Sequence, residues 1–191
     1  MRLVFATNNM NKFQELEDLL PDNIELLSLQ DIGCHSELPE TKETLEGNAM
    51  QKAEFVFASY GYNCFSDDTG LEVKALNNAP GVYSARYAGK DCIASNNIRK
   101  LLDNLKSINN RSACFRTVIA LLIDGKKCLF EGKSSGNITK EILGNSGFGY
   151  DPIFLPDGSK ITFAQMTQKQ KGMISHRAKA TDKLVNFLQN Y

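Results

Sequence analysis

Apolar residues in the first third of the chain follow two spacings, that of a buried strand and that of an amphipathic helix. Residues 2–6 have the pattern of a buried strand, and the apolar positions after them recur at helical spacing until Pro21. Residues 24–29 form a second strand candidate, and a helix with one apolar face is expected from about Thr44 to Tyr60. The pattern predicts alternating β and α elements.

The rest of the chain adds two helices and a hairpin to this alternation. Residues 71–76 and 113–123 have strand patterns, and Asp124-Gly125 joins the second of these to 128–131, which predicts a β-hairpin. Helical spacing returns over 93–105 and from Ser175 to about Gln189. We therefore predict a single α/β domain over residues 1–191 without a linker, in which the hairpin extends a mixed sheet into a second lobe.

Composition narrows the class of protein. The formal net charge is zero, which argues against bulk electrostatic binding to nucleic acid or membrane. The chain has five scattered cysteines without a C-x-x-C pair and only two histidines. This pattern argues against a zinc site and against a disulfide framework. No apolar run is long enough to span a bilayer. We expect a cytoplasmic protein with reduced thiols and no membrane or nucleic-acid partner.

The charges are unevenly distributed despite the zero sum. Between Glu15 and Glu46 there are ten acidic residues and one basic residue, whereas from Lys160 onward there are six basic residues and one acid. Solvated helix faces are the usual cause of such runs. The two regions could also supply the metal-binding and anion-binding sides of one cleft.

The segment Ser66-Asp67-Asp68-Thr69-Gly70 carries two adjacent carboxylates. At the end of a strand and before a glycine turn, they would point to opposite faces and so could not duplicate one another. A solvated turn is the ordinary interpretation, because Asp and Gly are common turn residues. The functional interpretation is a magnesium ligand beside a general base.

Two helix starts are suited to anions. The loop 7–12 precedes a helix for which Asn9 or Asn11 is a natural N-cap, and Lys12 in its first turn opposes the helix dipole unless an anion is present. This loop lacks the glycines and the Lys-Ser/Thr pair of a Walker A motif. The helix that follows Ser175 has His176 and Arg177 in its first turn.

Two further features complete the candidate chemistry. Asn48 and Lys52 lie one helical turn apart, so they could reach one ligand together. Phe148 is bracketed by glycines and followed by Tyr150 and Asp151. Such an aromatic residue is either a buried plug or a stacking platform for a flat base.

Taken in order, these segments resemble the inosine triphosphate pyrophosphatase family. The resemblance covers residues 7 to 177 and is carried by six motifs: Thr7-x-Asn9-x-x-Lys12, Asn48-Ala49-x-x-Lys52-Ala53, Ser66-Asp67-Asp68-Thr69-Gly70-Leu71, Pro80-Gly81-Val82-Tyr83-Ser84-Ala85-Arg86-Tyr87, Gly147-Phe148-Gly149-Tyr150-Asp151-Pro152 and Ile174-Ser175-His176-Arg177. It implies hydrolysis of non-standard purine nucleoside triphosphates (ITP, dITP, XTP) to the monophosphate and pyrophosphate. It also implies a two-lobed α/β fold around a long mixed sheet, a substrate cleft between the lobes, and a homodimer.

The resemblance further implies a role for individual residues. Asp68 would be the general base and a ligand of Mg²⁺, with Glu40 as second ligand. The neighbouring Asp67 is either a supporting ligand of the same ion or a residue that contacts the ligands without touching the metal. Substrate contacts are implied for Thr7, Asn8, Asn9, Met10, Asn11, Lys12, Lys52, Thr69, Phe148, Gly149, Tyr150, Asp151, Lys171, His176 and Arg177. One departure is Gly47, where many relatives carry Glu. Preference among ITP, XTP and dITP, and the exclusion of GTP, are not evident from the sequence.

Two other functions fit parts of the pattern. Asp68-Thr69-Gly70 is also the core tripeptide of aspartic proteases, although there the motif usually follows apolar residues, and here Asp67 precedes it. A non-catalytic nucleotide sensor would use the loop 7–12 without needing the acidic pair. Magnesium-dependent activity would distinguish the pyrophosphatase from both.

Overall fold

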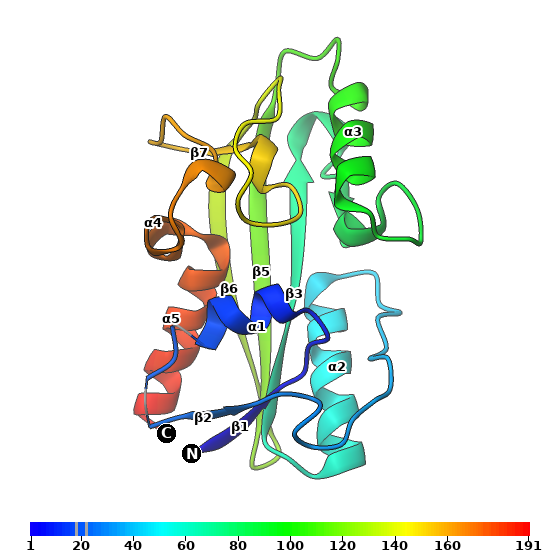
Figure 1. The fold of residues 1–191 in the computed structure, drawn as a ribbon. Helices are drawn as coiled ribbons and strands as arrows, with labels where there is room; N and C mark the ends of the chain where they lie inside the picture. The colour runs from blue at the N-terminus through cyan, green and yellow to red at the C-terminus, as the bar shows by residue number, and fades with distance from the viewer. Residues whose placement is uncertain (18, 22) are drawn as a thin grey trace. The chain divides into compact units, whose positions relative to one another are not determined.

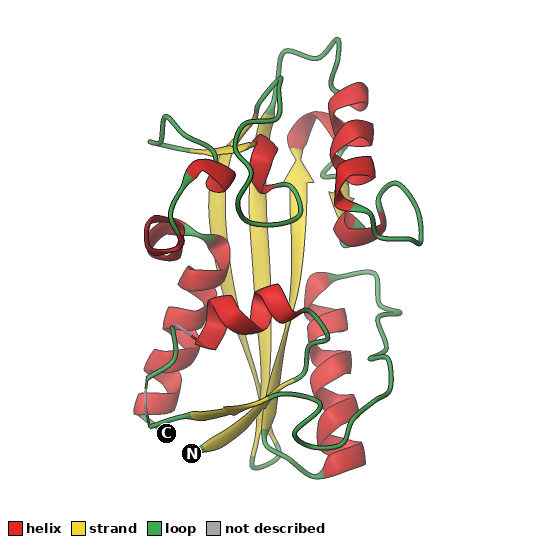
Figure 2. Cartoon of the chain, viewed as in Figure 1, coloured by secondary structure: helices red, strands yellow, loops and turns green. Residues whose placement is uncertain are grey.

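The computed structural model describes residues 1–17, 19–21 and 23–191, which form an α/β fold around a seven-stranded mixed sheet (Figure 1). The strands are β1 (Arg2–Phe5), β2 (Glu25–Leu27), β3 (Cys64–Val73), β4 (Pro80–Gly81), β5 (Ser112–Ile123), β6 (Lys126–Ile138) and β7 (Phe154–Pro156). The α-helices are α1 (Met10–Glu17), α2 (Leu45–Tyr60), α3 (Ala94–Asn104), α4 (Gln168–Ile174) and α5 (His176–Gln189) (Figure 2). The strand order is β2-β1-β3-β5-β6-β7, with β4 paired to β3. The predicted fold class is confirmed.

The chain divides into two compact units. Unit 1 contains Met1–Asp68, Thr117–Gly132 and His176–Tyr191, and unit 2 contains Thr69–Arg116 and Lys133–Ser175. The strands β3, β5 and β6 therefore contribute residues to both units. That residues 1–191 act as a single domain stays a prediction.

Unit 1 buries both faces of its strands, because successive side chains of a strand point to opposite faces. β1 pairs in parallel with β2 and with β3. Val4 and Cys64 pack on one face with the apolar side of α2. Phe5 and Phe65 pack on the other face with α1 and α5, and their rings stack at 4.7 Å between centroids. The same alternation separates the two carboxylates that follow Phe65.

Unit 2 has its own aromatic core. Phe115 of β5 contacts the Phe154 ring edge to face at 4.7 Å, and Phe163 lies 5.1 Å from Phe154. Leu101 of α3 and Ile138 of β6 complete this cluster. Loop segments with short 3₁₀ helices at Asp151–Ile153 and Phe163–Gln165 pack against it. These segments carry the Phe148 motif.

The glycine turn predicted directly after Asp67 and Asp68 is wrong. β3 runs without interruption through the acidic pair and ends at Val73, and the 3₁₀ helix Lys74–Leu76 follows, so 71–76 is a strand only in its first half. Gly70 serves close approach rather than a turn, because a Cβ at this position would lie 2.6 Å from the carbonyl oxygen of Gly81 in β4. Pairing on both sides of β3 outweighs the local turn propensity of Asp and Gly.

Other boundaries differ from the sequence pattern in informative ways. The hairpin is confirmed, with positive φ at both Asp124 (48°) and Gly125 (76°), but β6 continues to Ile138, well beyond the predicted residue 131. Its second half alternates buried and exposed residues, many of them small and polar. The helix α4, which carries Lys171, was not predicted, because its apolar positions are too few to show a period. The predicted helix before Pro21 forms α1, while position 18 lies outside the described residues.

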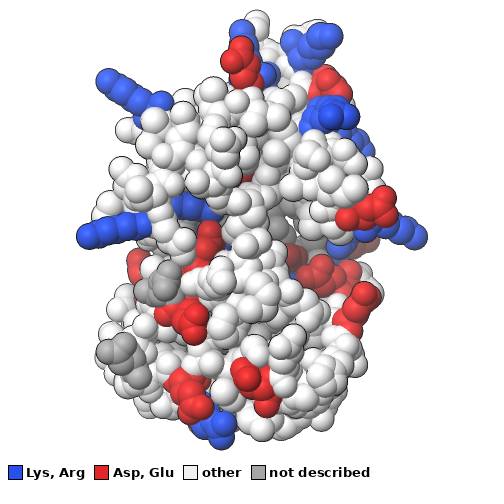
Figure 3. Space-filling view, viewed as in Figure 1, with Lys and Arg blue, Asp and Glu red and all other residues white. Residues whose placement is uncertain are grey.

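The surface agrees with the zero net charge. On the face drawn in Figure 3, Lys and Arg side chains occur together with Asp and Glu side chains amid uncharged surface. Among the described residues, no helix is both long enough and apolar enough to cross a membrane. The acidic run between Glu15 and Glu46 includes positions 18 and 22, which lie outside the described residues.

Candidate active site

Asp67 lies in β3 on the face covered by α1 and α5, and its side chain is completely buried. Its Oδ1 accepts a hydrogen bond from Nζ of Lys12 at 2.9 Å, and its Oδ2 lies 3.5 Å from Nε of Arg177. Burial alone would raise the pKa of this carboxyl, but Lys12, then Arg177 and Lys52, together hold it well below its ordinary value. Asp67 is therefore an ionised group between cations.

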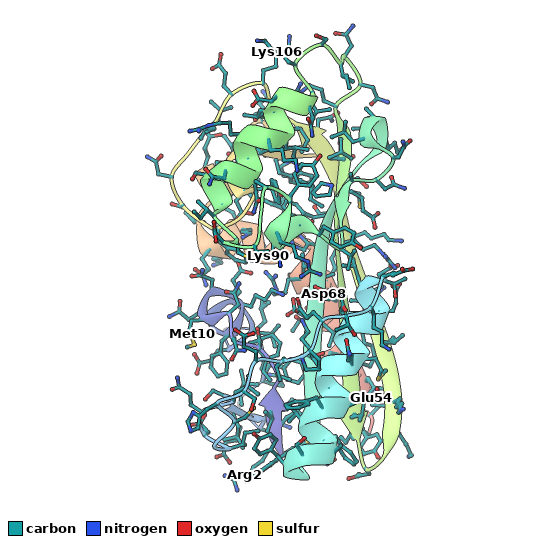
Figure 4. The ribbon with its side chains drawn as sticks, turned by 90° about the vertical axis from the view of Figure 1, so that its right-hand side faces the viewer. Arg2, Met10, Glu54, Asp68, Lys90 and Lys106 are labelled. Carbon is teal, nitrogen blue, oxygen red and sulfur yellow. The ribbon has the colours of Figure 1, made fainter. Side chains whose placement is uncertain are left out.

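Asp68 points to the opposite face, toward the first turns of α2 (Figure 4). Its Oδ2 accepts a hydrogen bond from Nδ2 of Asn48 at 3.1 Å. Nζ of Lys52 donates to Oε1 of Glu40 at 2.5 Å and to the main-chain oxygen of Asp67 at 2.8 Å. Burial raises the pKa of Asp68, opposed by Lys52 and Lys12 and assisted by Glu40. The two neighbouring carboxylates thus have different surroundings, as the strand period predicts.

The N-terminal half of α2 is held so that two of its side chains reach β3. Thr44 caps the helix by accepting a hydrogen bond from the N–H of Gly47 at 3.0 Å. One turn later, Oδ1 of Asn48 accepts from the N–H of Lys42 at 2.8 Å, which orients its amide toward Asp68. Asn48 and Lys52 contact adjacent residues of β3, Asp68 and Asp67, and their joint contact with one ligand stays a prediction. We refer to Lys12, Glu15, Glu40, Asn48, Lys52, Asp67, Asp68 and Arg177 as the charge cluster; all belong to unit 1.

The loop 7–12 begins α1 with a local cap. Oδ1 of Asn9 accepts hydrogen bonds from the N–H groups of Asn11 at 3.0 Å and Lys12 at 3.2 Å, so Asn9 is the N-cap. Oγ1 of Thr7 accepts from the N–H of Asn9 at 3.2 Å. The loop residues Asn8, Met10 and Asn11 are exposed. Lys12 in the first turn of α1 was expected to need an anion beside it, and in this structure the Asp67 carboxylate is that anion.

Arg177 connects α5 to the charge cluster. It is almost completely buried and forms ion pairs with Glu15 of α1 and with Asp67. His176 before it is also buried. Close approach of β6 fixes this turn, because a Cβ at Gly132 would lie 2.0 Å from the carbonyl oxygen of His176. Glu15 was not predicted as a site residue; its position one turn after Lys12, on a helix that starts at a polar loop, was the available signal.

Unit 2 carries a second cluster around the loop 147–151, which we call the Phe148 loop. Oδ2 of Asp151 accepts hydrogen bonds from the N–H of Phe148 at 2.9 Å and from Nζ of Lys171 at 2.7 Å. The Lys171 ammonium lies 4.9 Å from the centroid of the Phe148 ring and 5.7 Å from that of Phe163, within cation–π range. Gly147 has φ +76°, and a Cβ there would lie 2.2 Å from the Asp151 carboxylate. The loop is therefore ordered around one carboxylate.

Two more predicted residues lie in unit 2. The phenol of Tyr150 is buried and donates a hydrogen bond to the main-chain oxygen of Ser84 at 2.8 Å, which ties the Phe148 loop to the segment 80–87. Burial also raises the pKa of this phenol. Thr69 follows Asp68 in β3 and is half-buried. The predicted site residues thus fall into two groups, one in each unit.

Comparison with known proteins identifies the family. Residues 3–187 match the Ham1 family. The chain belongs to this family. It is 55% identical over 190 residues to a dITP/XTP pyrophosphatase of Flavobacterium psychrophilum, covering 100% of both chains, and 53% identical over 188 residues to that of Porphyromonas gingivalis, covering 98% of this chain and 97% of the other.

Solved Ham1 structures have the same fold. The Staphylococcus aureus Ham1 protein matches with a TM-score of 0.91 at 38% identity, covering 100% of this chain and 99% of the other. A Ham1 protein from Coxiella burnetii matches with a TM-score of 0.93 at 35% identity, covering 100% of both chains. The predicted family resemblance is confirmed, and the aspartic protease interpretation of Asp68-Thr69-Gly70 is set aside.

Proposed function

We propose that this protein hydrolyses non-standard purine nucleoside triphosphates (dITP, XTP and ITP) to the monophosphate and pyrophosphate, and so removes them from the nucleotide pool. The observation that carries the proposal is the charge cluster, in which Asp68 lies among Asn48, Lys52 and Glu40 in a member of the Ham1 family. The relatives named dITP/XTP pyrophosphatase match over essentially their whole length, which supports the same chemistry.

Asp68 is the proposed general base. Its carboxylate accepts a proton from a water molecule that attacks the α-phosphorus, and the bond to the bridging oxygen breaks so that pyrophosphate leaves. The amide of Asn48 holds one carboxylate oxygen at 3.1 Å, which leaves the orientation of Asp68 little freedom. Lys12 and Lys52 offset the negative charge that develops on the phosphate oxygens. Because both ammonium groups are already fixed by carboxylates, little reorganisation accompanies the reaction.

Magnesium is the proposed cofactor, with Glu40 and Asp68 as its protein ligands. Both carboxylates lie close to Lys52, and the charge of Glu40 helps to raise the pKa of Asp68. No group of three acidic, histidine or cysteine side chains able to hold a metal occurs in the described part of the chain. Two carboxylates suit a Mg²⁺ ion that also binds waters and substrate phosphates. When bound, the ion would stabilise negative charge on the phosphate oxygens. These residues therefore fit an ion that binds together with the nucleotide.

The Phe148 loop is the proposed contact for the base. Its aromatic ring offers a stacking surface, and Lys171 and the N–H groups of the loop are donors. Hypoxanthine and xanthine carry a carbonyl acceptor at C6, where adenine carries an amino donor. A site of donors would leave polar groups unpaired with adenine, and such sites can discriminate by roughly 10⁴-fold. His176, Arg177, Thr69 and the loop 7–12 remain predicted substrate contacts.

The test is pyrophosphate release from dITP, XTP, ITP, GTP and ATP, with and without magnesium. We expect release from the first three, dependent on the metal, and little from ATP. Asp68→Asn should lower kcat by about 10³-fold or more while leaving nucleotide affinity within a few-fold, because the amide has nearly the same shape. Near-normal turnover of this variant would show that Asp68 is not the base. A protein that binds nucleotides but releases no pyrophosphate would be the sensor considered above.

We also propose that the protein acts as a homodimer in the cytoplasm. The support is the family resemblance for the dimer, and the scattered free cysteines for a reducing compartment. Light scattering coupled to size-exclusion chromatography tests the first point, with a mass of twice 21.2 kDa expected. A mass of one chain at micromolar concentration would contradict it.

A further inference from the structure

Asp67 has contacts unlike those of a metal ligand. Its side chain has 0% exposure, and the two carboxylate oxygens face different cations, Lys12 on α1 and Arg177 on α5. The main-chain oxygen of the same residue accepts the ammonium of Lys52 from α2. Asp67 of β3 therefore contacts one cation from each of the helices α1, α2 and α5.

The strand period separates Asp67 from the proposed metal ligands. Asp68 and Glu40 interact with side chains of α2, whereas the Asp67 carboxylate lies on the face covered by α1 and α5. Consecutive side chains of a strand point to opposite faces, so the two aspartates cannot place carboxylate oxygens on the same side of β3. Each carboxylate oxygen of Asp67 already faces a cation, so a magnesium ion bound there would lie beside Lys12 or Arg177 and be repelled by its charge.

The cations need this carboxylate because they lie close to one another. Burial lowers the pKa of the Lys12 ammonium, and repulsion from Lys52 and Arg177 lowers this pKa further. The Asp67 carboxylate is the main group that opposes them. Glu15 holds Arg177 from the other side. The Lys12 ammonium has three N–H donors, of which Asp67 accepts one. Asp67 thus fixes the position of the ammonium without consuming all its donors.

We propose that Asp67 is a positioning residue, which holds Lys12 and Arg177 together as a preformed site for the phosphate oxygens of the substrate, and that it does not ligate magnesium. This inference rests on the proposed function, since it assigns the cations to the triphosphate. Of the two roles that the sequence left open for Asp67, this proposal rejects the metal ligand and makes the residue an anion that acts through two cations.

The test separates phosphate binding from metal binding. The variants are Asp67→Asn and Asp68→Asn, with Glu54→Gln as a matched control, since Glu54 lies on the surface of α2 and forms an ion pair with the exposed Lys127, away from the charge cluster. The first measurement is the affinity for α,β-methylene-ITP, which the enzyme cannot cleave between the α- and β-phosphorus. The second is the affinity of Mn²⁺ for the complex with this analogue, followed by electron paramagnetic resonance. Neither readout requires turnover.

We expect Asp67→Asn to weaken analogue binding about tenfold or more, because two charge-assisted contacts lose their fixed geometry, and to leave Mn²⁺ affinity within about twofold of wild type. Asp68→Asn should instead weaken Mn²⁺ binding and leave the affinity for the analogue within a few-fold of wild type. Equal loss of Mn²⁺ affinity in both variants would show that Asp67 is a ligand. Unchanged analogue affinity in Asp67→Asn would show that it positions nothing. Failure of the wild type to release pyrophosphate would refute the proposed function instead, and it leaves these two binding results interpretable.

A second variant covers the case in which Asp67→Asn folds poorly. Removing the anion leaves Lys12 and Arg177 as unbalanced cations, so the double variant Lys12→Met, Asp67→Asn should regain part of the lost resistance to urea while analogue binding stays weak. Lys12→Met alone serves as its reference. Absence of any recovery in the double variant would overturn the proposed balance of charges.

Discussion

Replacing Gly132 with alanine would place a methyl group where β6 meets the first turns of α5. The new Cβ would lie 2.0 Å from the carbonyl oxygen of His176 and 2.5 Å from the main-chain nitrogen of Ala180. Favourable contacts between heavy atoms lie near 3.5 Å, so the strand and the helix must separate by more than about 1 Å. Both opposing atoms belong to the backbone of a helix, which cannot yield locally as a flexible side chain would.

The expected cost has a structural and a functional part. Overpacking of this kind lowers the free energy of unfolding by about 1–3 kcal/mol, which at an m-value of about 2 kcal/mol/M moves the urea midpoint down by roughly 1 M. His176 and Arg177 lie in the turn that must move, and a displacement of about 1 Å at a binding group can lower the rate about 100-fold. We therefore expect kcat/KM for dITP to fall by about that factor, although Gly132 itself contacts no phosphate.

The assay pairs urea unfolding, followed by circular dichroism, with pyrophosphate release at low substrate concentration. Leu129→Ala is the control, since Leu129 lies in the same strand and is largely exposed, and surface changes of this kind stay within about 0.5 kcal/mol. A Gly132→Ala variant with an unchanged midpoint and turnover within twofold of wild type would refute the close approach. Lost stability with normal kcat/KM would show that the strand moves and the helix start does not.

Three further predictions concern other parts of the molecule. Tyr150→Phe should lower the free energy of unfolding by about 1–3 kcal/mol, because the oxygen of Ser84 loses its buried donor; a urea midpoint equal to that of wild type would contradict this. Burial raises the pKa of the Cys64 thiol to about 12, so the folded state favours the neutral thiol. The stability that the neutral Cys64 thiol contributes is complete below the unfolded pKa of about 8.5 and is lost as pH rises toward 12, at up to about 1.4 kcal/mol per pH unit. Urea midpoints of the wild type should therefore fall more steeply between pH 8.5 and 10.5 than those of Cys64→Ala. Parallel slopes for the two proteins would refute the assignment. Because two carboxylates suit magnesium only with substrate phosphates present, calorimetry should detect no millimolar or tighter Mg²⁺ binding without nucleotide; a tight site in the free protein would mean that further ligands exist.

The order of elements could be predicted from the sequence because it depends on local periodicity. The helix from Thr44 to Tyr60, the Asp124-Gly125 hairpin and the helix after Ser175 all occur where spacing and capping residues placed them. The N-cap was narrowed to Asn9 or Asn11, and the structure selects Asn9 because its side chain reaches two N–H groups. Features of this kind need only residues that are near in sequence.

The residues of the candidate site could largely be predicted from the sequence, but the ion pairs and hydrogen bonds between them could not. Motifs named the aspartates, the lysines and Arg177, and the strand period correctly predicted that Asp67 and Asp68 face opposite ways. Glu15 was missed, because its partner Arg177 is 162 residues away and its own neighbourhood looks like a solvated helix face. Asp151 was predicted as a site residue, but its bond to Lys171 was not, because that bond depends on a helix that the pattern did not show.

The sequence by itself therefore determined which elements form, which residue types are available and on which side of β3 each carboxylate points. Only the tertiary structure decided that residues 66–70 continue a strand, and that Gly70 and Gly132 are sites of close backbone approach. It also decided that Asp67 meets cations from three helices. The physical reason is that periodicity records the direction of a side chain, whereas its partner, its burial and therefore its charge state depend on segments that are distant in the chain.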